Sequence, residues 1–253
     1  MRIYIGVDPR QPVAYNVLHW SIVRRSSKPV AIVPLVLPAL PITRTGLTDF
    51  TYSRYLCPAL SGYQGISVFL DADMLVLEDI SHWWKALGNY ELFYTDKVKT
   101  FRNELVTDTF YRKVFEANDL PNVYCGMYYF KRTDNNHKFF ELLKDVVKNY
   151  SWYSEKYTSK NTQSWCSMDV STAIAIKIQN IAHQVFSKKN FLTFTHMKPN
   201  IQNWLAQKDS WLEVIDYNFN NANELMVGNF LQKGIFHYVE KSFVTDKMME
   251  QLQ

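Results

Sequence analysis

The stretch SVFLDADMLVLEDI, residues 67–80, constrains the fold more than any other part of the sequence. Two acids, Asp71 and Asp73, lie one residue apart in the middle of this apolar run. A carboxylate that is buried without a partner is costly, so another group must compensate these charges. A continuous apolar segment is typical of a strand covered on both faces in a parallel sheet. The sequence therefore predicts a buried strand that ends at two acids.

The N-terminal part of the chain alternates between strand and helix patterns. Residues 2–7 (RIYIGV) and 29–37 (PVAIVPLVL) have strand patterns, the second limited by prolines, and residues 12–26 (PVAYNVLHWSIVRRS) predict an amphipathic helix. Residues 49–62 (DFTYSRYLCPALSG) predict a further helix that leads into the strand ISVFLDAD. This order predicts an α/β fold with a mostly parallel sheet. Ligands bind such sheets at the carboxyl ends of the strands, where the two acids fall.

Composition excludes several classes of protein. The 253 residues contain no internal repeat and no Gly/Ser linker, which predicts a single domain over residues 1–253. The three cysteines have no CxxC spacing, which argues against a disulfide framework or structural zinc. The N-terminus resembles neither a signal peptide nor an anchor, and the longest apolar run carries three prolines, so we expect no membrane span and a cytoplasmic location. The net charge of +4 suits an anionic ligand but not a dedicated nucleic-acid arm.

The spacing of the two acids favours a divalent cation. If the strand stays regular, Asp71 and Asp73 point to the same side while Ala72 turns away. Two carboxylates suit Mg²⁺ or Mn²⁺, which share their coordination with substrate phosphates. A carboxylate that only caps the turn after the strand is the alternative interpretation of a D-x-D.

The residues around the D-x-D carry a longer pattern. The matching positions are Thr51, Tyr52, Arg54 and Leu60 in a T-Y-x-R-x-x-x-x-x-L helix, and Asp71, Asp73, Leu77, Asp79, Ile80 and Trp84 in and after the strand. On these residues the chain resembles glycosyltransferase family 8, the glycogenin-like and lipopolysaccharide-galactosyltransferase family, with related members in bacteria and phages. The resemblance implies a GT-A (nucleotide-diphospho-sugar transferase) domain. It also implies transfer of a hexose, glucose or galactose, from a UDP-sugar to an acceptor hydroxyl with retention.

The resemblance assigns a set of residues to the donor. In the opening segment, Asp8, Arg10 and Tyr15 are expected near the base and ribose. The full set of donor-binding candidates is Asp8, Arg10, Tyr15, Arg54, Ala72, Gly126 and Lys241. In NVYCGMYYFKR, Gly126 matches the family, whereas Tyr124 replaces an expected Asn. In SWCSMDVSTAI only Asp169 of an expected D-Q-D-x-L-N is kept, and it is a candidate for contacts with the hydroxyls of the donor sugar.

A histidine near the C-terminus completes the implied metal site. The segment GIFHYVEKSF resembles the family's H-x-x-G-x-K-P-W segment, which assigns His237 to the metal and Lys241 to the diphosphate. A competing segment, FTHMKPNIQNW, offers His196 and Lys198. We favour His237, because it follows an apolar strand-like run close to the end of the chain. A histidine ligand beside two carboxylates favours Mn²⁺ over Mg²⁺.

The mechanism needs charge compensation at the leaving diphosphate, which a cation with Lys or Arg supplies. A double displacement requires a carboxylate close to the anomeric carbon, and inversion requires a base beside the acceptor hydroxyl. Asp96 and Asp169 are the catalytic candidates for either role, and their spacing does not choose between them. The resemblance implies retention, with the departing phosphate oxygen helping to deprotonate the acceptor.

Residues 148–165 (KNYSWYSEKYTSKNTQSW) interleave basic and aromatic side chains without clear periodicity, which predicts a loop near the donor. The acceptor-side candidates are Trp152, Lys156, Lys160 and Trp165. Aromatic faces stack on sugars and on bases, and lysines meet phosphates, so a glycan, a lipid-linked sugar or a hydroxymethylated DNA base would each suit the segment. An ordinary polar loop is the alternative.

The sequence is also compatible with two other functions. The run VFLDADMLVL also resembles the first motif of haloacid-dehalogenase-type phosphatases, in which the first Asp is a nucleophile and the second a general acid. That motif continues D-G-T/V, whereas this chain has Met74 and Leu75. A non-catalytic module that binds a nucleotide sugar is the other alternative. The sequence does not indicate an oligomeric state.

Overall fold

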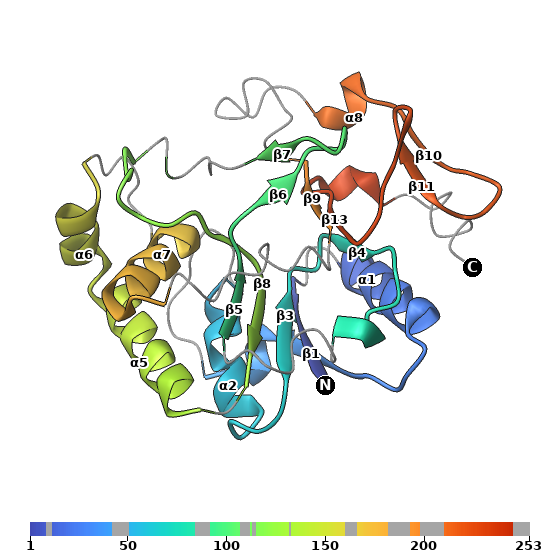
Figure 1. Cartoon of the computed structure of the whole chain (residues 1–253). Coiled ribbons are helices and arrows are strands. Elements are labelled where there is room, and N and C mark those ends of the chain that lie inside the picture. The colour runs from blue at the N-terminus through green and yellow to red at the C-terminus, as the bar shows by residue number, and fades with distance from the viewer. Residues whose placement is uncertain are drawn as a thin grey trace.

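The computed structural model describes residues 1–8, 12–41, 51–83, 92–106, 112, 115–131, 133–159, 166–181, 193–197 and 210–244. For residues 93, 126–130 and 241 the description is limited to the backbone. Two five-stranded sheets lie within this part of the chain, joined end to end rather than stacked (Figure 1).

The first sheet forms the centre of the molecule. Its strands are β1 (Arg2–Val7), β2 (Ala31–Val36), β3 (Ser67–Leu70), β5 (Leu92–Thr95) and β8 (Tyr124–Phe130), in the order β2-β1-β3-β8-β5. Strand β1 pairs in parallel with β2 and β3, whereas β8 runs antiparallel to both β3 and β5. Four of the five strands therefore point the same way. Pro34 lies within β2, which an edge strand tolerates because one side of it needs no ladder hydrogen bonds.

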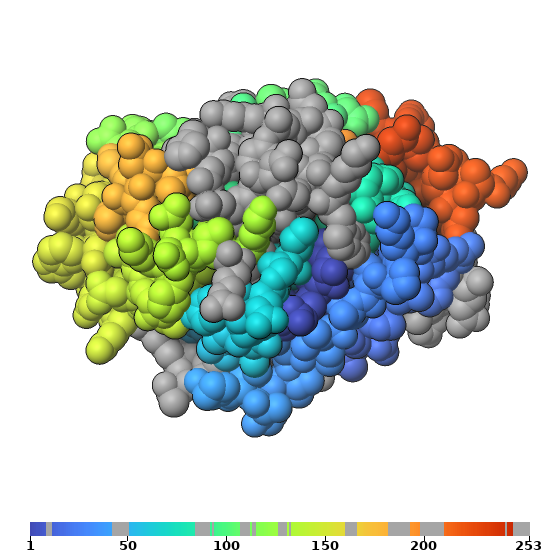
Figure 2. All heavy atoms as spheres, turned by 60° about the horizontal axis from the view of Figure 1, so that its bottom comes forward, coloured from blue at the N-terminus to red at the C-terminus, as the bar shows by residue number. Residues whose placement is uncertain are grey.

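Helices cover both faces of this sheet, and the side chains of β1 show why. Ile3 and Ile5 belong to the core cluster that contains Leu18 of α1 (Pro12–Arg25), whereas Tyr4 belongs to the cluster on the opposite face. Alternate residues of a strand point to opposite faces, so an unbroken apolar strand needs cover on both. The second face is covered by α5 (Asp134–Lys148) and α7 (Met168–Gln179), with α6 (Tyr150–Tyr157) at their outer end. Figure 2 shows α5 and α6 on the opposite side of the molecule from α1.

Local signals fix the ends of the covering helices. Thr133 caps α5 by accepting a hydrogen bond from the Asn136 backbone, and Ser167 caps α7 in the same way through Val170. Asn180 ends α7 in the left-handed conformation that asparagine tolerates.

The second sheet continues the chain beyond the D-x-D. Its strands are β4 (Met74–Val76), β6 (Val98–Lys99), β7 (Leu105–Val106), β9 (Phe194–His196) and β13 (Ile235–His237), in the order β4-β13-β9-β6-β7. A three-stranded antiparallel sheet of β10 (Tyr217–Phe219), β11 (Leu225–Val227) and β12 (Phe230–Leu231) lies beside it. An aromatic cluster around Trp211 of α8 (Trp211–Val214) packs against β4 and β13 of the second sheet. The Trp211 indole donates a hydrogen bond to the Tyr238 carbonyl at 2.8 Å.

The short helices are tight turns. They are η1 (Leu37–Ala39), η2 (Thr51–Leu56), α2 (Cys57–Leu60) and η6 (Lys241–Phe243). The predicted helix over residues 49–62 is, from residue 51 on, a 3₁₀ segment followed by one α-helical turn, with Pro58 in the first positions of α2. Residues 49 and 50 lie outside the described residues. No helix in the described ranges combines the length and the apolar character needed to cross a bilayer.

Two predictions about local structure are wrong. Strand β3 ends at Leu70, so residues 71–73 form a turn rather than a continuation of the strand. The basic and aromatic segment from residue 148 is not a loop where α6 covers it: Tyr150 and Ser154, one helical turn apart, are the buried positions of that helix. Because both side chains carry a hydroxyl group, the pattern of apolar residues did not indicate a helix.

Candidate functional site

The two acids lie where the chain leaves one sheet and enters the other. Strand β3 ends at Leu70 in the central sheet, and β4 begins at Met74 in the second sheet. The turn between them brings the Asp71 and Asp73 carboxylates to one side, although not by the strand alternation that the sequence suggested. Their oxygens and one imidazole nitrogen of His237 all lie within 4.8 Å of one another. This is the predicted metal-binding triad.

Strand pairing places the histidine. Strand β13 lies between β4 and β9, so His237 is paired with Met74 on one side and with His196 on the other. His237 Nε2 is 3.0 Å from Asp73 Oδ1. The backbone of the next residue, Tyr238, donates to the Asp73 carbonyl at 3.1 Å, which ties the turn to β13. The third member of the triad is therefore held by sheet geometry rather than by a loop.

Arg54 holds the other carboxylate. Its Nη2 lies 2.8 Å from Asp71 Oδ1, its Nε donates to the Thr51 carbonyl at 3.0 Å, and its Nη1 donates to the Cys125 carbonyl. The guanidinium also lies 4.6 Å from the centre of the Phe69 ring, and the side chain is only 7% exposed. A planar guanidinium with several fixed partners has little freedom, so it orients Asp71 rigidly.

The two carboxylates differ electrostatically. Burial raises the pKa of Asp71 to about 6, against the opposing charge of Arg54 and with a further upward contribution from Asp73. Burial acts on Asp73 in the same direction, but the charge and hydrogen bond of His237 outweigh it and lower the pKa of Asp73. Two neighbouring carboxylates repel each other when both are ionised, and a cation between them removes that repulsion. Two carboxylates with one imidazole are a donor set that fits Mn²⁺ or Mg²⁺.

Asp169 joins the site through one backbone segment. It lies in the first turn of α7, and its Oδ1 accepts a hydrogen bond from the Cys125 N–H at 2.8 Å. The Cys125 carbonyl accepts a hydrogen bond from Arg54 Nη1. Cys125 therefore links Arg54 to Asp169, and the charge of Asp169 contributes to the raised pKa of Asp71. Asp96 follows β5, which ends at the same edge of the sheet as β3, and its Oδ1 is buried without a hydrogen-bond partner in the described structure.

The other donor candidates occupy the same edge or lie outside the described residues. Asp8 is buried directly after β1, and Tyr15 lies in the first turn of α1, where burial raises its pKa. Ala72 is buried in the turn, and Gly126 lies within β8. Arg10 and Lys198 fall outside the described residues, as does Trp84 of the motif, and for Lys241 only the position of its backbone in η6 is described.

The two acceptor-side candidates that the structure describes, Trp152 and Lys156, lie on α6, away from the triad (Figure 1). Trp152 is 57% exposed on α6, and Lys156 Nζ lies 5.0 Å from the centre of its indole ring. Helix α6 packs on α5 and α7 and lies at the outer edge of the molecule (Figure 1). Burial raises the pKa of Tyr150, the first residue of α6, and the charge of Asp169 contributes to that rise. Lys160 and Trp165 fall outside the described residues.

Tyr238 is a site residue that the sequence did not indicate. Its hydroxyl lies 3.5 Å from the Ala72 carbonyl, and its backbone holds Asp73. An aromatic residue after an apolar strand is typical of any core, so no pattern distinguishes it.

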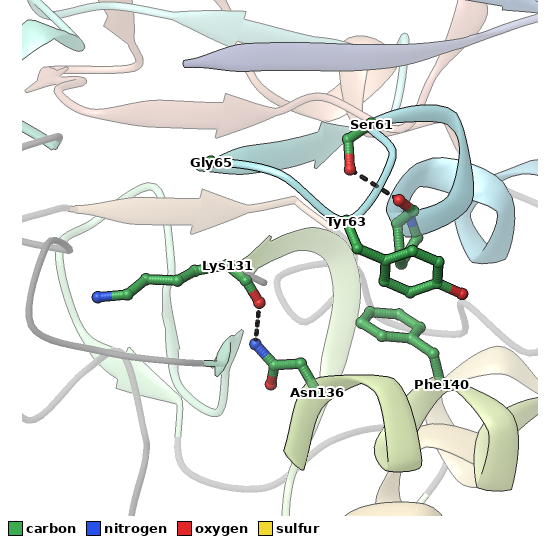
Figure 3. A pocket seen from close by; sticks show the side chains of 7 residues that line it. Ser61, Tyr63, Gly65, Lys131, Asn136 and Phe140 are labelled. Carbon is green, nitrogen blue, oxygen red and sulfur yellow. Dashed lines mark hydrogen bonds between the residues drawn. The ribbon is translucent and has the colours of Figure 1, made fainter. Parts of the chain in front are cut away.

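A small pocket lies at the opposite end of the central sheet and takes no part in the site. Ser61, Tyr63, Lys131 and Phe140 are among the residues that line it, and the Asn136 side chain closes it by donating to the Lys131 carbonyl at 2.6 Å (Figure 3). Gly65 in its wall precedes β3, whereas Asp71 follows that strand.

No family model matches the sequence. Protein CDI of Arabidopsis thaliana is 37% identical over 141 residues, which cover 49% of this chain and 53% of that protein. This chain thus spans about half the length of that curated relative.

Solved structures give the fold. The bifunctional glycosyltransferase WbbM is similar over 100% of this chain and 49% of its own, with 16% identity and a TM-score of 0.52. The galactosyltransferase LgtC, solved with donor and acceptor sugar analogues, is similar over 100% of this chain and 95% of its own, with 14% identity and a TM-score of 0.46. Similarity to WbbM along the whole chain, together with the mixed sheet and its two helical layers, confirms the predicted α/β GT-A fold.

Proposed function

We propose that this protein is a divalent-metal-dependent glycosyltransferase that moves a hexose from a UDP-sugar to a hydroxyl of a glycan, with retention. The observation that carries the proposal is the convergence of Asp71, Asp73 and His237 at the junction of two sheets in a GT-A fold. Glucose and galactose are the proposed sugars, and Mn²⁺ is the proposed ion, with Mg²⁺ as the alternative. The hydroxymethylated DNA base that the sequence also allowed has no support among these observations.

The donor would bind across the carboxyl edge of the central sheet. A cation held by Asp71, Asp73 and His237 would supply positive charge where the diphosphate departs. Asp8 and Tyr15 lie at the end of β1 and the start of α1, the part of an α/β sheet that commonly receives the nucleoside. Gly126 and Lys241 complete the proposed donor contacts.

The chain's own residues would position the sugar. Arg54 fixes Asp71, so that this carboxylate keeps one orientation. Asp169 Oδ1 accepts the Cys125 N–H, which holds this carboxylate beside β8, and Asp169 is the proposed contact for a hydroxyl of the donor sugar. Asp96 is the second proposed catalytic carboxylate. In the retaining reaction, the departing phosphate oxygen takes the proton of the attacking hydroxyl while the anomeric C–O bond breaks and the new glycosidic bond forms.

The experiment that tests the proposal is incubation of the purified chain with UDP-glucose or UDP-galactose, Mn²⁺ and a panel of simple glycosides. We expect release of UDP and a product heavier by one hexose, and loss of both in EDTA and in Asp73→Asn. Release of inorganic phosphate from sugar phosphates instead would support a phosphatase, a function that the GT-A fold already disfavours. Binding of a UDP-sugar without any product would support the non-catalytic module.

A further inference from the structure

A groove that takes no part in the triad lies beside the end of α1. It runs between the last turn of α1, the residues after β4 and the β11–β12 hairpin, which lie on one side of the molecule (Figure 1). Its volume is about 440 Å³, which is enough for a small ligand. None of the three triad residues lines the groove, and strand β4 separates Glu78 in its wall from Asp73, so the groove is separate from the triad.

Gln232 supplies the first sign of a ligand. The residue is 3% exposed, and its Nε2 donates to the Phe101 carbonyl at 2.8 Å and the Phe230 carbonyl at 2.9 Å. These two bonds fix which end of the amide is oxygen. Oε1 is buried and accepts no hydrogen bond from any described residue, although the side chain lines the groove. A buried acceptor without a donor is costly, so the groove calls for a hydroxyl or amine at this point.

Two charged side chains that line the groove also have buried polar atoms. Arg25 Nη1 is buried without a hydrogen-bond partner among the described residues. Glu78 Oε1 is buried as well, and the side chain that interacts with this carboxylate is the indole of Trp83. Burial lowers the pKa of Arg25 and raises that of Glu78, the latter against a hydrogen bond with the Trp83 side chain and the charges of His82 and Lys233. Arg25 and Glu78 line the same space but form no ion pair with each other in the described structure.

The position of Arg25 at the end of α1 does not by itself explain its burial. Cations in the last turn of a helix favour the helix dipole, and Arg24 and Arg25 both stand there. A cation that only stabilised the helix dipole would point to solvent or donate hydrogen bonds to the carbonyls at the end of the helix. Arg24 instead lies over the Trp20 ring at 4.7 Å, and Arg25 Nη1 is buried with no acceptor that the structure describes.

We propose that this groove is a second binding site, for a small saccharide that carries a negative charge. The anionic group would pair with Arg25 and Lys233, and hydroxyl groups would donate to Glu78 and to Gln232 Oε1. A simple anion would leave Gln232 Oε1 without a donor, and a neutral sugar would leave the buried guanidinium without an acceptor. An anionic saccharide satisfies all of them at once.

The test is calorimetric titration of the full chain carrying Asp73→Asn, in EDTA and without nucleotide, so that the triad cannot capture the probe. The probes are glucose 1-phosphate, glucuronate, glucose and inorganic phosphate, and the first two distinguish a phosphate group from a carboxylate. We expect one or both of these two to bind with a Kd on the order of 0.1–1 mM. Glucose and inorganic phosphate should bind at least about tenfold more weakly. This measurement does not depend on transferase activity.

Substitutions locate the site. Arg25→Met should weaken binding of the anionic saccharide at least about tenfold, because it removes a charged donor. Glu78→Met should weaken it about fivefold, although removal of a negative charge would tighten the binding of a simple anion. Lys28→Met, which removes one positive charge from an exposed position three residues from Arg25, is the matched control and should change nothing.

Three outcomes would overturn the proposal: no binding of either anionic saccharide, inorganic phosphate binding as tightly as glucose 1-phosphate, or tighter saccharide binding in Glu78→Met. The thermal unfolding midpoint of each variant guards against misfolding. Arg25→Met should leave that midpoint unchanged or raised, since it removes a buried donor that has no partner.

Discussion

His196 and His237 occupy directly paired positions of the neighbouring parallel strands β9 and β13, with their ring centres 4.5 Å apart. The sequence offered these two residues as competitors for one place in a metal site. The structure puts them side by side, with His237 Nε2 against Asp73 and His196 packed between the rings of Tyr124 and His237. The competitors thus have different positions relative to the triad, and their roles can be separated.

His237→Ala should weaken Mn²⁺ binding at least about tenfold, because it removes one of three donors. His196→Ala should weaken it less than about threefold, since His196 supports the His237 ring without belonging to the group of potential ligands found in the described part of the chain. Electron paramagnetic resonance titration of free Mn²⁺ measures both affinities. A larger loss in His196→Ala than in His237→Ala would move the site to β9.

Arg54→Met should lower the free energy of unfolding by about 3 kcal/mol, because it leaves the Asp71 carboxylate buried beside Asp73 without its countercharge. Asp71→Asn should recover part of this loss when combined with Arg54→Met, since the amide carries no charge. Urea denaturation of the two single variants and the double variant gives the coupling free energy. A double variant whose loss equals the sum of the two single losses would show that Arg54 and Asp71 do not act as a pair.

Asp169→Asn should fold like the parent and lose transferase activity, whereas Asp169→Ala should lose activity and also about 1 kcal/mol of stability. The asparagine carbonyl can still accept the Cys125 N–H, which alanine leaves unpaired. Denaturation measures stability, and hexose transfer measures activity. If Asp169→Asn keeps full activity, the charge of Asp169 has no part in the reaction and its role is only to hold β8.

The sequence predicted the parts of this structure that depend on local periodicity. The apolar runs of β1 and β3, and the spacing of α1, specify which faces are buried, and the structure has these elements at the expected places. The position of the D-x-D at the carboxyl end of β3 follows from the same reasoning, because the apolar run stops at Leu70. The fold class could therefore be predicted before the structure.

The rest depends on contacts between distant segments. The approach of His237 to Asp73 arises from the pairing of β13 with β4, and that of Asp169 to Arg54 from one backbone segment at the start of β8. Neither register can be derived from a single strand. Helix α6 was missed because Tyr and Ser, rather than aliphatic residues, occupy its buried positions. The groove beside α1 involves residues from three separate segments, and no local pattern joins them.

Asp79→Ala should lower the free energy of unfolding by about 1–2 kcal/mol at pH 7, as loss of a cap does. Asp79 Oδ1 accepts from the Ser81 N–H at 2.8 Å and from the Ser27 N–H at 3.1 Å, which ties the end of α1 to the segment after β4. Burial alone would raise the pKa of Asp79, but the hydrogen bonds from Ser27 and Ser81 outweigh it and hold that pKa well below its usual value. Asp79→Asn, which keeps an acceptor, is the control and should cost less.

The sign of the pH dependence follows from the lowered pKa. An Asp in the unfolded chain titrates near about pH 3.9, so the contribution of Asp79 is fully present above that pH and is lost as the pH falls through the lower folded value. The difference in stability between the parent and Asp79→Ala should therefore be constant from pH 5 to pH 8 and shrink below about pH 4. A difference that grows on acidification would contradict the assignment of these hydrogen bonds.

Gly234→Ala should disrupt the metal site from a distance. Gly234 has a φ of 72°, and a Cβ built on it would lie 2.0 Å from the Thr193 carbonyl oxygen, which accepts the Ile235 N–H at 2.8 Å. Its own carbonyl accepts the Leu77 N–H at 2.7 Å. The added methyl group must push β13 away from β9 or out of register with β4, and His237 lies three residues further along the chain, at the end of β13. We expect a loss of at least about 2 kcal/mol in unfolding free energy and weaker Mn²⁺ binding in the fraction that folds.

Gly62→Ala is the matched control, because Gly62 also has a positive φ, 61°, but nothing within 4 Å of its Cβ position. Equal effects of the two substitutions on Mn²⁺ affinity would show that the cost is backbone strain alone, and that β13 keeps its place without the close contact.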